Sequence, residues 1–270
     1  LIAEYILKNY DKAAFMTAAK LGISVGVSES TVVRFANELG FSGYPKLQKA
    51  LQELIKNKLT TVQRLELSND FASHGAALKG VLKADMENIR ATLEKINPYT
   101  FEDVLNSIFE AKNIYIIGLR SSTALAEFLG FYLNIILQNV RIVSYGISDI
   151  FEQMINIGEG DLVIGIGFPR YATKTIDVLD FSKARGAKVV AITDSLLSPL
   201  AAKADSTLIA QSNMASFVDS LVAPLSVINA LIIAVGMREK ENIADIFANL
   251  ENIWQEYNVY SYNNRNVADD

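Results

Sequence analysis

Cysteine is absent from this chain of 270 residues, and its absence excludes disulfide bonds, thiolate catalysis and cysteine-based zinc sites. A chain without cysteine suits a reducing compartment, so we expect a cytoplasmic protein. Proline is also scarce, with five residues in the whole chain, which leaves little room for disorder. Half of the residues are apolar, and the length suits a small domain beside a domain of ordinary size.

Long hydrophobic runs are missing as well. The most apolar stretch, residues 221–235, is interrupted by Pro224, Ser226 and Asn229 and is shorter than the ~20 residues that a bilayer requires. We therefore expect a buried helix there, and we find no signal peptide pattern. Because the first helix begins without a cap or an initiator methionine, we also expect that the numbering starts inside the natural protein.

Strong positive charge is the third absence, since the net charge of −5 argues against binding to nucleic acid through bulk charge. Up to residue 70, nine Lys and Arg side chains stand against seven Asp and Glu side chains, a net charge of +2 that leaves −7 for the remainder. This asymmetry has the sign that a DNA-binding domain needs, although differences of this size are common between halves of proteins.

Residues 27–44 combine a helix cap, a helical period and a stop signal. Ser28 is a good N-cap, a helix is predicted from residue 29 to 39, and Gly40 can end it in the left-handed conformation. One arc of that helix is apolar and predicted to pack, and it contains Val32, Phe35, Ala36 and Leu39. With a short helix at 18–25 and a tight turn at 26–27, the spacing predicts a helix-turn-helix. Such helix pairs also occur without DNA, in which case Arg34 is only a solvated charge.

The residues themselves are more specific than the spacing. The string VSESTVVRF at 27–35, followed by LGFSGY at 39–44 and by Leu47, resembles the N-terminal domain of the RpiR family of bacterial transcription regulators. In that family the second helix of the motif enters the major groove. The resemblance implies that DNA faces Ser28, Ser30, Thr31 and Arg34, with Arg34 best placed for a phosphate or a guanine edge.

Helices are also predicted at 1–9 and from 45 to about 58, so residues 1–58 form an all-helical head. The helical period fades at 59–75, which we interpret as a linker. Apolar spacing then predicts a helix at 76–96, able to pack on its own domain or on a partner chain, and a second one at 100–111. The second domain spans 76–258, and the polar end at 259–270 is predicted to be a flexible tail.

Short apolar runs alternate with helical stretches after residue 112. Strands are predicted at 113–118, 139–145, 161–167, 188–193 and 207–210. Helices are predicted between and after them at 122–137, 149–157, 173–185, 198–203, 216–235 and 239–257. This pattern is typical of a doubly wound α/β sandwich with a parallel sheet, and the fold class is multidomain, with an all-α head before it. Ligands in such folds bind at the carboxyl ends of the strands.

Two of these strand ends carry anion-binding chemistry. The loop GLRSST at 118–123 opens into a helix, whose N–H groups, hydroxyls and dipole favour an anion, although Ser121 or Ser122 could serve only as the N-cap. The loop GFPRYATKT at 167–175 also opens into a helix and adds the Arg170 guanidinium, which suits a phosphate or carboxylate. At 193–201, by contrast, Ser198 and Pro199 are better explained by helix capping.

Taken in order, these loops resemble the SIS domain, the sugar isomerase fold that binds phosphosugars in isomerases and regulators. The similarity covers about residues 113–210 and is strongest at 118–122, 161–167 and 186–201. An RpiR-like head before this domain is the usual arrangement of the family. The expected ligand-binding residues are Arg120, Ser121, Ser122, Arg170, Tyr171 and Thr173. The chain departs from the usual Ser-x-Ser-Gly sequence of the third loop, because Gly167, Pro169 and Arg170 occupy those positions.

Together the two resemblances imply a DNA-binding regulator of sugar metabolism whose SIS domain senses a phosphosugar or another anionic sugar. Helices flanking a SIS domain commonly build dimers, so we expect a homodimer or a higher homo-oligomer. The alternative is a SIS-type phosphosugar isomerase, which needs an acid and a base. The only histidine, His74, lies in the predicted linker, and Glu127 and Glu152 lie inside helices. We therefore predict no catalytic residue, no metal and no cofactor.

Overall fold

The computed structural model describes residues 1–55, 60–67, 73–215 and 217–260. It divides into two compact units, which we call the head unit and the sheet unit. The head unit contains Leu1–Glu94 together with Phe168–Ala172 and Gln211–Ala223, and the remaining residues form the sheet unit. Parts of the predicted linker, at 59 and 68–72, and most of the predicted tail, at 261–270, lie outside the described residues.

The start of the head unit is all-helical, as predicted. Its helices are α1 (Ile2–Lys8), α2 (Tyr10–Ala13), α3 (Ala18–Val25), α4 (Glu29–Glu38) and α5 (Tyr44–Ile55). The four-residue α2 was not predicted. The region is held together by a buried apolar cluster that joins α1 to α5 and includes Ile6, Leu21, Val32, Ala36 and Leu47.

The close approach of α3 and α4 depends on small side chains and caps. The Thr17 side chain accepts a hydrogen bond from the Lys20 N–H and begins α3, and Gly26 ends that helix in the left-handed conformation at φ 76°. At Gly22, a Cβ atom would lie 2.7 Å from the backbone oxygen of Val27. Glycine therefore lets the two helices meet at the short turn that a helix-turn-helix requires.

The apolar arc of α4 is buried at Val32 and Ala36 and half-buried at Phe35. Val32 and Ala36 have no exposed surface, whereas Leu39 is 53% exposed, so its predicted packing was wrong. Leu39 is the C-cap residue, since α4 ends at Glu38. Gly40 follows at φ 86°, the left-handed conformation predicted for it.

Tyr44 ties α5 to the loop before α3. Its hydroxyl donates a hydrogen bond of 2.8 Å to the backbone oxygen of Met16. Burial raises the pKa of Tyr44, because the phenolate would lose its hydration. The hydroxyl therefore keeps its proton and remains a donor. This contact gives the tyrosine of the LGFSGY run a structural role.

Two further helices follow α5 in the head unit: α6 (Thr61–Leu67), inside the predicted linker, and α7 (His74–Lys95). The polar residues Asn88 and Thr92 of α7 are buried. Asn88 donates to the backbone oxygen of Asn213 at 2.9 Å, and the Thr92 hydroxyl accepts from the Gln211 N–H at 2.8 Å. Besides charged residues, α7 exposes a row of large apolar side chains, with exposed fractions between 39% and 75% at Leu78, Val81, Leu82, Met86, Ile89 and Leu93.

The sheet unit contains a five-stranded parallel sheet in the order β2-β1-β3-β4-β5, which confirms the predicted doubly wound architecture. The strands are β1 (Ile114–Gly118), β2 (Val140–Val143), β3 (Leu162–Ile166), β4 (Lys188–Thr193) and β5 (Ser206–Ile209). Every residue of β1 and β3 is buried, which explains why their sequences are continuous apolar runs.

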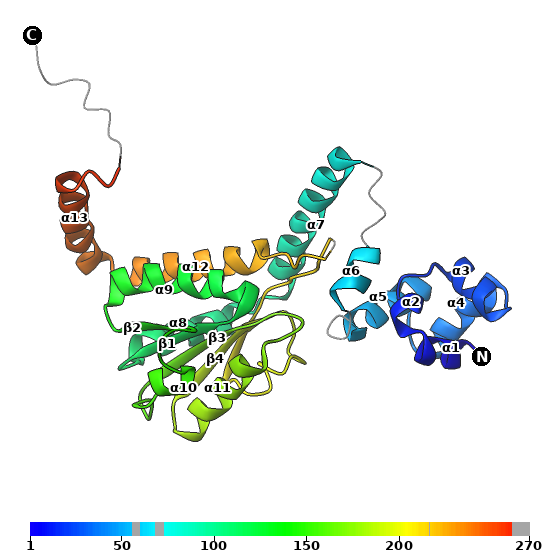
Figure 1. Cartoon of the computed structure of the whole chain (residues 1–270), viewed down its shortest axis with the longest axis horizontal. Helices are drawn as coiled ribbons and strands as arrows, with labels where there is room; N and C mark the ends of the chain where they lie inside the picture. The colour runs from blue at the N-terminus through cyan, green and yellow to red at the C-terminus, as the bar shows by residue number, and fades with distance from the viewer. Residues whose placement is uncertain (56–59, 68–72, 216, 261–270) are drawn as a thin grey trace, which may run out of the picture. The chain divides into compact units, whose positions relative to one another are not determined.

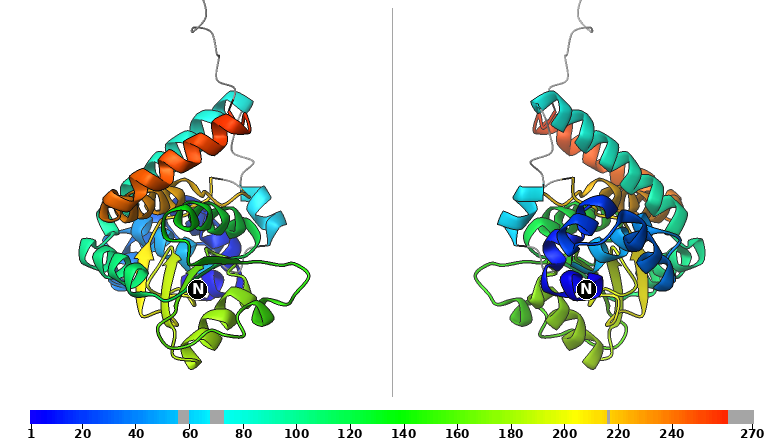
Figure 2. Two further views of the ribbon diagram at one scale, coloured as in Figure 1. Left: turned by 90° about the vertical axis from the view of Figure 1, so that its left-hand side faces the viewer. Right: turned by 90° about the vertical axis from the view of Figure 1, so that its right-hand side faces the viewer.

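Helices cover both faces of this sheet. Helices α9 (Thr123–Leu137) and α12 (Val222–Arg238) lie on one face, and α10 (Ile150–Gln153) and α11 (Thr173–Ala184) lie on the other (Figure 1). The side views in Figure 2 show the same layers, with α9 above the strands and α11 below them. Helix α8 (Pro98–Glu110) packs near β5, and α13 (Lys240–Glu256) contacts α9.

Three predicted helices differ from the structure. The helix predicted at 216–235 begins only at Val222. Residues 199–203 form turns, and β5 begins soon after them at Ser206. Ser198 still acts as a cap, since its side chain accepts from the Ala201 N–H at 3.0 Å. Helix α10 ends at Gln153, not at residue 157.

The apolar helix α12 has fully buried residues, among them Ile228 and Leu231, as predicted for this stretch. Among the described residues, no single helix has the length and apolar content to cross a membrane. Helix α12 meets those criteria only when it is combined with residues of α13 across a bend of 109°.

Candidate nucleic-acid interface and ligand-binding loops

The predicted DNA-facing residues all lie at the start of α4 or one turn further along it. Ser28, Ser30 and Arg34 are exposed, and Thr31 is half-buried. The Ser28 hydroxyl lies 2.8 Å from both the Ser30 and the Thr31 hydroxyls, and it accepts from the Thr31 N–H at 3.2 Å. Ser28 is therefore a structural cap, while Ser30, Thr31 and Arg34 present polar groups on the side of α4 away from its buried arc.

The two predicted ligand loops begin at the same edge of the sheet. Strands β1 and β3 are parallel neighbours, and their registers pair Gly118 with Ile166 at the carboxyl end. The loop after β1 and the loop after β3 therefore leave the sheet from adjacent positions. The topology supports the expectation that both sequences serve one edge of the sheet.

The loop after β1 forms a tight turn over the end of its strand. Residues Arg120–Ser122 form a 3₁₀ turn, η1, before α9, with Arg120 and Ser121 exposed and Ser122 buried. Arg120 has φ 60°, a left-handed conformation that is costly for a residue with a side chain. The Ser122 side chain makes no capping hydrogen bond. Helix capping therefore does not explain the serine pair.

Gly118 is required by the same turn. A Cβ atom at this position would lie 2.5 Å from the backbone oxygen of Ser122. Because that neighbour is backbone, it cannot move aside as a flexible side chain could. The glycine thus allows η1 to fold onto the end of β1.

The loop after β3 keeps the backbone shape of a glycine turn without the glycine. Arg170 has φ 65°, the left-handed conformation that glycine adopts most readily. At Gly167, a Cβ atom would lie 2.8 Å from the Leu200 side chain, so packing fills the place where a serine side chain would lie. The departure from Ser-x-Ser-Gly therefore exchanges hydroxyl donors for an apolar contact and an exposed guanidinium.

The other residues predicted in this loop are less buried than its first part. Tyr171 is half-buried, and Thr173 is exposed as the first residue of α11. The Arg170 Nη1 atom donates a hydrogen bond of 2.9 Å to the Thr61 hydroxyl of α6. The guanidinium that was predicted to meet a ligand therefore contacts the segment that was predicted to be a linker.

One further hydroxyl in the same region was not assigned from sequence. Thr175, in the first turn of α11, is 1% exposed, and its Oγ1 atom has no hydrogen-bond partner among the described residues. A buried hydroxyl without a partner is costly and therefore uncommon. The Thr-Lys-Thr sequence at 173–175 contains the signal, but the sequence alone does not say which of the two threonines points inward.

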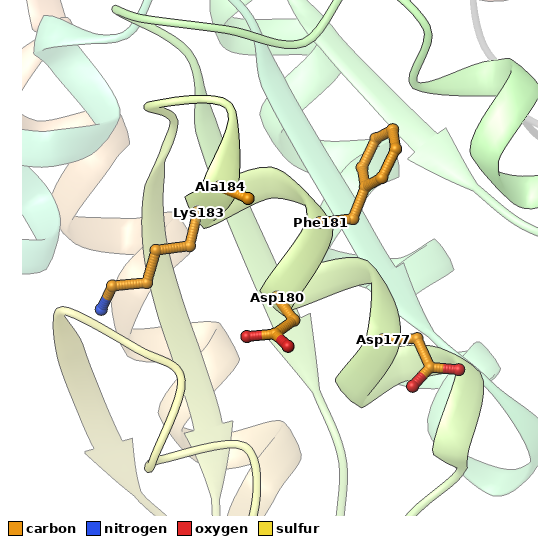
Figure 3. Close-up of a pocket in the computed structure, with 5 residues that line it drawn as sticks. All are labelled: Asp177, Asp180, Phe181, Lys183 and Ala184. Atoms are coloured by element: carbon orange, nitrogen blue, oxygen red, sulfur yellow. The ribbon is translucent and has the colours of Figure 1, made fainter.

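A hollow of 570 Å³ lies elsewhere on α11, lined by Asp177, Asp180, Phe181, Lys183 and Ala184. In Figure 3 the two carboxylates point away from the Phe181 ring. Lys183 is paired with Asp205 at 2.8 Å, and Lys203 is paired with Asp180 at 2.7 Å. These lysines are already neutralised by carboxylates, so the hollow is unsuited to an anion.

The pKa of Asp205 reflects its ion pair with Lys183. Burial by itself raises the pKa of Asp205, but hydrogen bonds from Lys183 and the Val189 N–H, with the charges of Lys183 and Lys188, outweigh it. The pKa of this carboxyl is therefore lowered. The ion pair stabilises the fold at neutral pH and is lost as the pH falls through the lowered pKa, because protonation removes the negative charge.

The residues considered for acid or base chemistry lie in ordinary helix positions. The Glu152 carboxylate accepts from the Asp149 N–H at 2.9 Å and completes a capping box at the start of α10. Glu127 is exposed on α9, and His74 is exposed at the first position of α7. Within the described part of the chain, no three His, Asp or Glu side chains are grouped so as to hold a metal ion.

Comparison with known protein families divides the chain in the same way as the motifs do. Residues 1–58 match the model of the helix-turn-helix domain of the rpiR family. Residues 107–234 match the model of the SIS domain.

Relatives that match most of the chain are transcriptional regulators. An HTH-type transcriptional regulator of Caldanaerobacter subterraneus subsp. tengcongensis is 23% identical over 97% of this chain and 93% of its own length. The HTH-type transcriptional regulator HexR of Escherichia coli is 28% identical over 75% of this chain and 69% of its own length.

Solved structures give the same result for the fold. The sugar isomerase domain of an RpiR transcription factor from Sphaerobacter thermophilus is 30% identical, with a TM-score of 0.61, over 64% of this chain and 96% of that chain. The Vibrio vulnificus NanR protein, solved in complex with ManNAc-6P, is 19% identical, with a TM-score of 0.59, over 97% of this chain and 93% of that chain.

We expect Gly118→Ala to disturb the loop after β1, because the new methyl group meets the Ser122 carbonyl. The midpoint of thermal unfolding should fall, by an amount corresponding to about 1–3 kcal/mol of overpacking. The matched control is Gly146→Ala, since a Cβ there has no atom within 4 Å. Equal midpoints for the two variants, measured by differential scanning calorimetry, would contradict the tight turn.

Proposed function

The chain belongs to the rpiR family of helix-turn-helix transcriptional regulators and carries a SIS domain, and from this premise we propose how it works. The α4 helix of the head binds operator DNA. The loops after β1 and β3 bind an anionic sugar, either a phosphosugar or a sugar acid, and two copies of the chain act together. The observation that carries the ligand half of the proposal is the pairing of Gly118 with Ile166, because it makes the two loops leave the sheet from adjacent strand ends.

The DNA half of the proposal rests on the exposed side of α4. Arg34 and Ser30 are exposed, whereas Val32 and Ala36 hold the helix onto the head. A guanidinium contacts a phosphate or the O6 and N7 atoms of guanine, and the hydroxyls near the helix start suit phosphate oxygens. Because the first 70 residues carry a net charge of only +2, binding depends on a few placed side chains more than on bulk charge.

We expect Arg34→Ala to weaken binding to the promoter next to the protein's own gene by about tenfold to a hundredfold. The matched control is Lys8→Ala, which removes the same charge from the same head but from an exposed ion pair with Glu4 on α1. Fluorescence titration over a range of salt concentrations measures both. If Arg34→Ala binds like the Lys8→Ala variant at every salt concentration, α4 is not the recognition helix.

The ligand half rests on the chemistry of two strand-end loops. Each loop opens into the first turn of a helix, where N–H groups and the helix dipole favour negative charge. Arg120 and Arg170 add cations, and Ser121 and Thr173 add exposed hydroxyl donors. The NanR relative of similar fold was solved with a phosphosugar, ManNAc-6P, which supports the same class of ligand here.

We expect a compound of this class to raise the midpoint of thermal unfolding, because it binds only the folded chain. A suitable panel is inorganic phosphate, glucose 6-phosphate, N-acetylmannosamine 6-phosphate and gluconate. Arg170→Ala should reduce the shift, since it removes a charged donor, whereas Arg185→Ala, an exposed arginine at the far end of α11, should leave the shift unchanged. No shift with any compound would count against the site.

A regulator is favoured over an isomerase by the positions of the acid and base candidates. Isomerisation of a sugar requires a base and an acid near the carbonyl carbon. Glu152 is engaged in a helix cap, and Glu127 and His74 are exposed on helix surfaces. Turnover of a sugar phosphate at ordinary enzymatic rates would favour the isomerase.

A homodimer is supported by the exposed apolar row of α7. This helix buries Asn88 and Thr92 and exposes a row of large apolar side chains, among them Leu82 and Met86. A row of exposed apolar residues along one helix is the surface that a second helix covers in a stable dimer. We infer that α7 of a second copy covers it and thereby holds two heads together.

Leu82→Glu should weaken the dimer by at least about tenfold, because it places a charge in the centre of the proposed contact. The control is Leu7→Glu on α1, a leucine that is even more exposed, at 78% against 54%. Analytical ultracentrifugation over a dilution series measures the dissociation. Equal dimer stability in both variants would rule out α7 as the interface.

A further inference from the structure

Helix α6 lies in the stretch that sequence periodicity suggested was a linker, yet it contains a buried charge. Arg64 is 2% exposed, and its Nη1 atom lies 2.7 Å from an Asp219 carboxylate oxygen. A buried arginine is costly unless a carboxylate neutralises it, so this ion pair fastens α6 to the segment around residue 219. A helix of seven residues, Thr61–Leu67, would be marginal without such a contact.

The segment that holds α6 is itself fixed at several points. It follows β5 and spans Gln211–Ala223 within the head unit. Asn88 of α7 bonds both the N–H and the backbone oxygen of Asn213, at 3.0 and 2.9 Å. Further along, Ser220 donates to Asp85 at 2.6 Å. Asp219 is thus presented by a segment that is already anchored to α7.

The second contact of α6 involves the proposed ligand loop. Arg170 donates to the Thr61 hydroxyl at 2.9 Å, at the first residue of α6. The loop residues Phe168–Ala172 also belong to the same compact unit as the DNA-binding helices, not to the sheet unit. One side chain of the ligand loop therefore already contacts the segment that follows the DNA-binding head.

We propose that α6 is a ligand-controlled latch, with the buried Arg64–Asp219 pair as its fixed end and the Arg170–Thr61 hydrogen bond as its releasable end. An anionic sugar that binds the Arg170 guanidinium competes with the Thr61 hydroxyl and frees the start of α6. This inference rests on the proposed function, because it uses the same arginine and the same class of ligand.

The two ends differ in charge and in burial. The Arg64–Asp219 contact joins two opposite charges and its guanidinium is 2% exposed, whereas the Arg170–Thr61 bond joins an exposed guanidinium to a neutral, exposed hydroxyl. A charged ligand is the better partner for a guanidinium than a hydroxyl is, so exchange of partners is favourable. Since coupling is reciprocal, removing the Thr61 hydroxyl must tighten ligand binding by the same factor by which ligand loosens this contact.

Hydrogen exchange on the full-length chain tests the fixed end without a ligand. Asp219→Asn removes the partner of a buried guanidinium, so amides at 61–67 should exchange at least about tenfold faster. Asp180→Asn, which breaks an exposed ion pair at 2.7 Å in the sheet unit, should leave these amides unchanged. Unchanged amides of β3 report that both variants are folded. Equal exchange at 61–67 in parent and Asp219→Asn overturns the latch.

A double-mutant cycle tests the releasable end. The compound tested is the panel member that gives the largest thermal shift. Thr61→Val should tighten its binding by about threefold to tenfold, because the Thr61 hydroxyl no longer competes with it for the Arg170 guanidinium. In the Arg170→Ala background the same substitution should have no effect, because the competition is already gone. Isothermal titration calorimetry measures all four proteins.

The outcomes separate the latch from the proposed function. If the compounds bind but Thr61→Val has the same effect in both backgrounds, the latch is wrong and the ligand site stands. If no compound binds the parent, the ligand half of the proposed function fails. Exchange at 61–67 in Arg170→Ala then tests the contact with α6 by itself: faster exchange supports this contact, and unchanged exchange overturns it together with the latch.

Discussion

The parallel pairing of β1 with β3 is the constraint on which the rest of the ligand chemistry depends. Because Gly118 is paired with Ile166, the two strands end together, and the loops that follow them leave from one edge of the sheet. Both loops then turn through a left-handed arginine and enter a helix. The strain of these two residues is offset by the buried strands that hold the loop ends, since every residue of β1 and β3 is covered.

The head unit follows a different principle, in which polar contacts determine where apolar surface is exposed. On α7, Asn88 and Thr92 bond the backbone of residues 211–213, and this orientation turns the leucines outward. On α6, one buried ion pair holds a short helix in place. Apolar burial dominates only in the first five helices, where Leu21, Val32 and Ala36 have no exposed surface. A regulator needs such a division, because polar contacts can be exchanged while a packed core cannot.

Much of this could be predicted from the sequence, and the failures have physical causes. The helix from Glu29, its cap at Ser28 and the left-handed Gly40 were predicted from local signals, as was β4 at Lys188–Thr193. Leu39 was misjudged because the helix period continues one residue beyond the packed arc. Helix α6 was missed because a buried Arg64 looks polar in sequence, and its partner Asp219 lies 155 residues away. Thr175 was not distinguished from Thr173, since burial decides between them and two residues of helix separate them.

The sequence by itself determined the two-part organisation, the five strands with most of the helices, and the residue types at the strand ends. These follow from local periodicity, capping and turn chemistry, which operate within a few residues. Only the tertiary structure decided which side of α7 is exposed, that Leu200 fills the space beside Gly167, and that Arg170 bonds Thr61. Those contacts join residues far apart in the chain, and a side chain selects such a partner only after the sheet and its covering helices have packed.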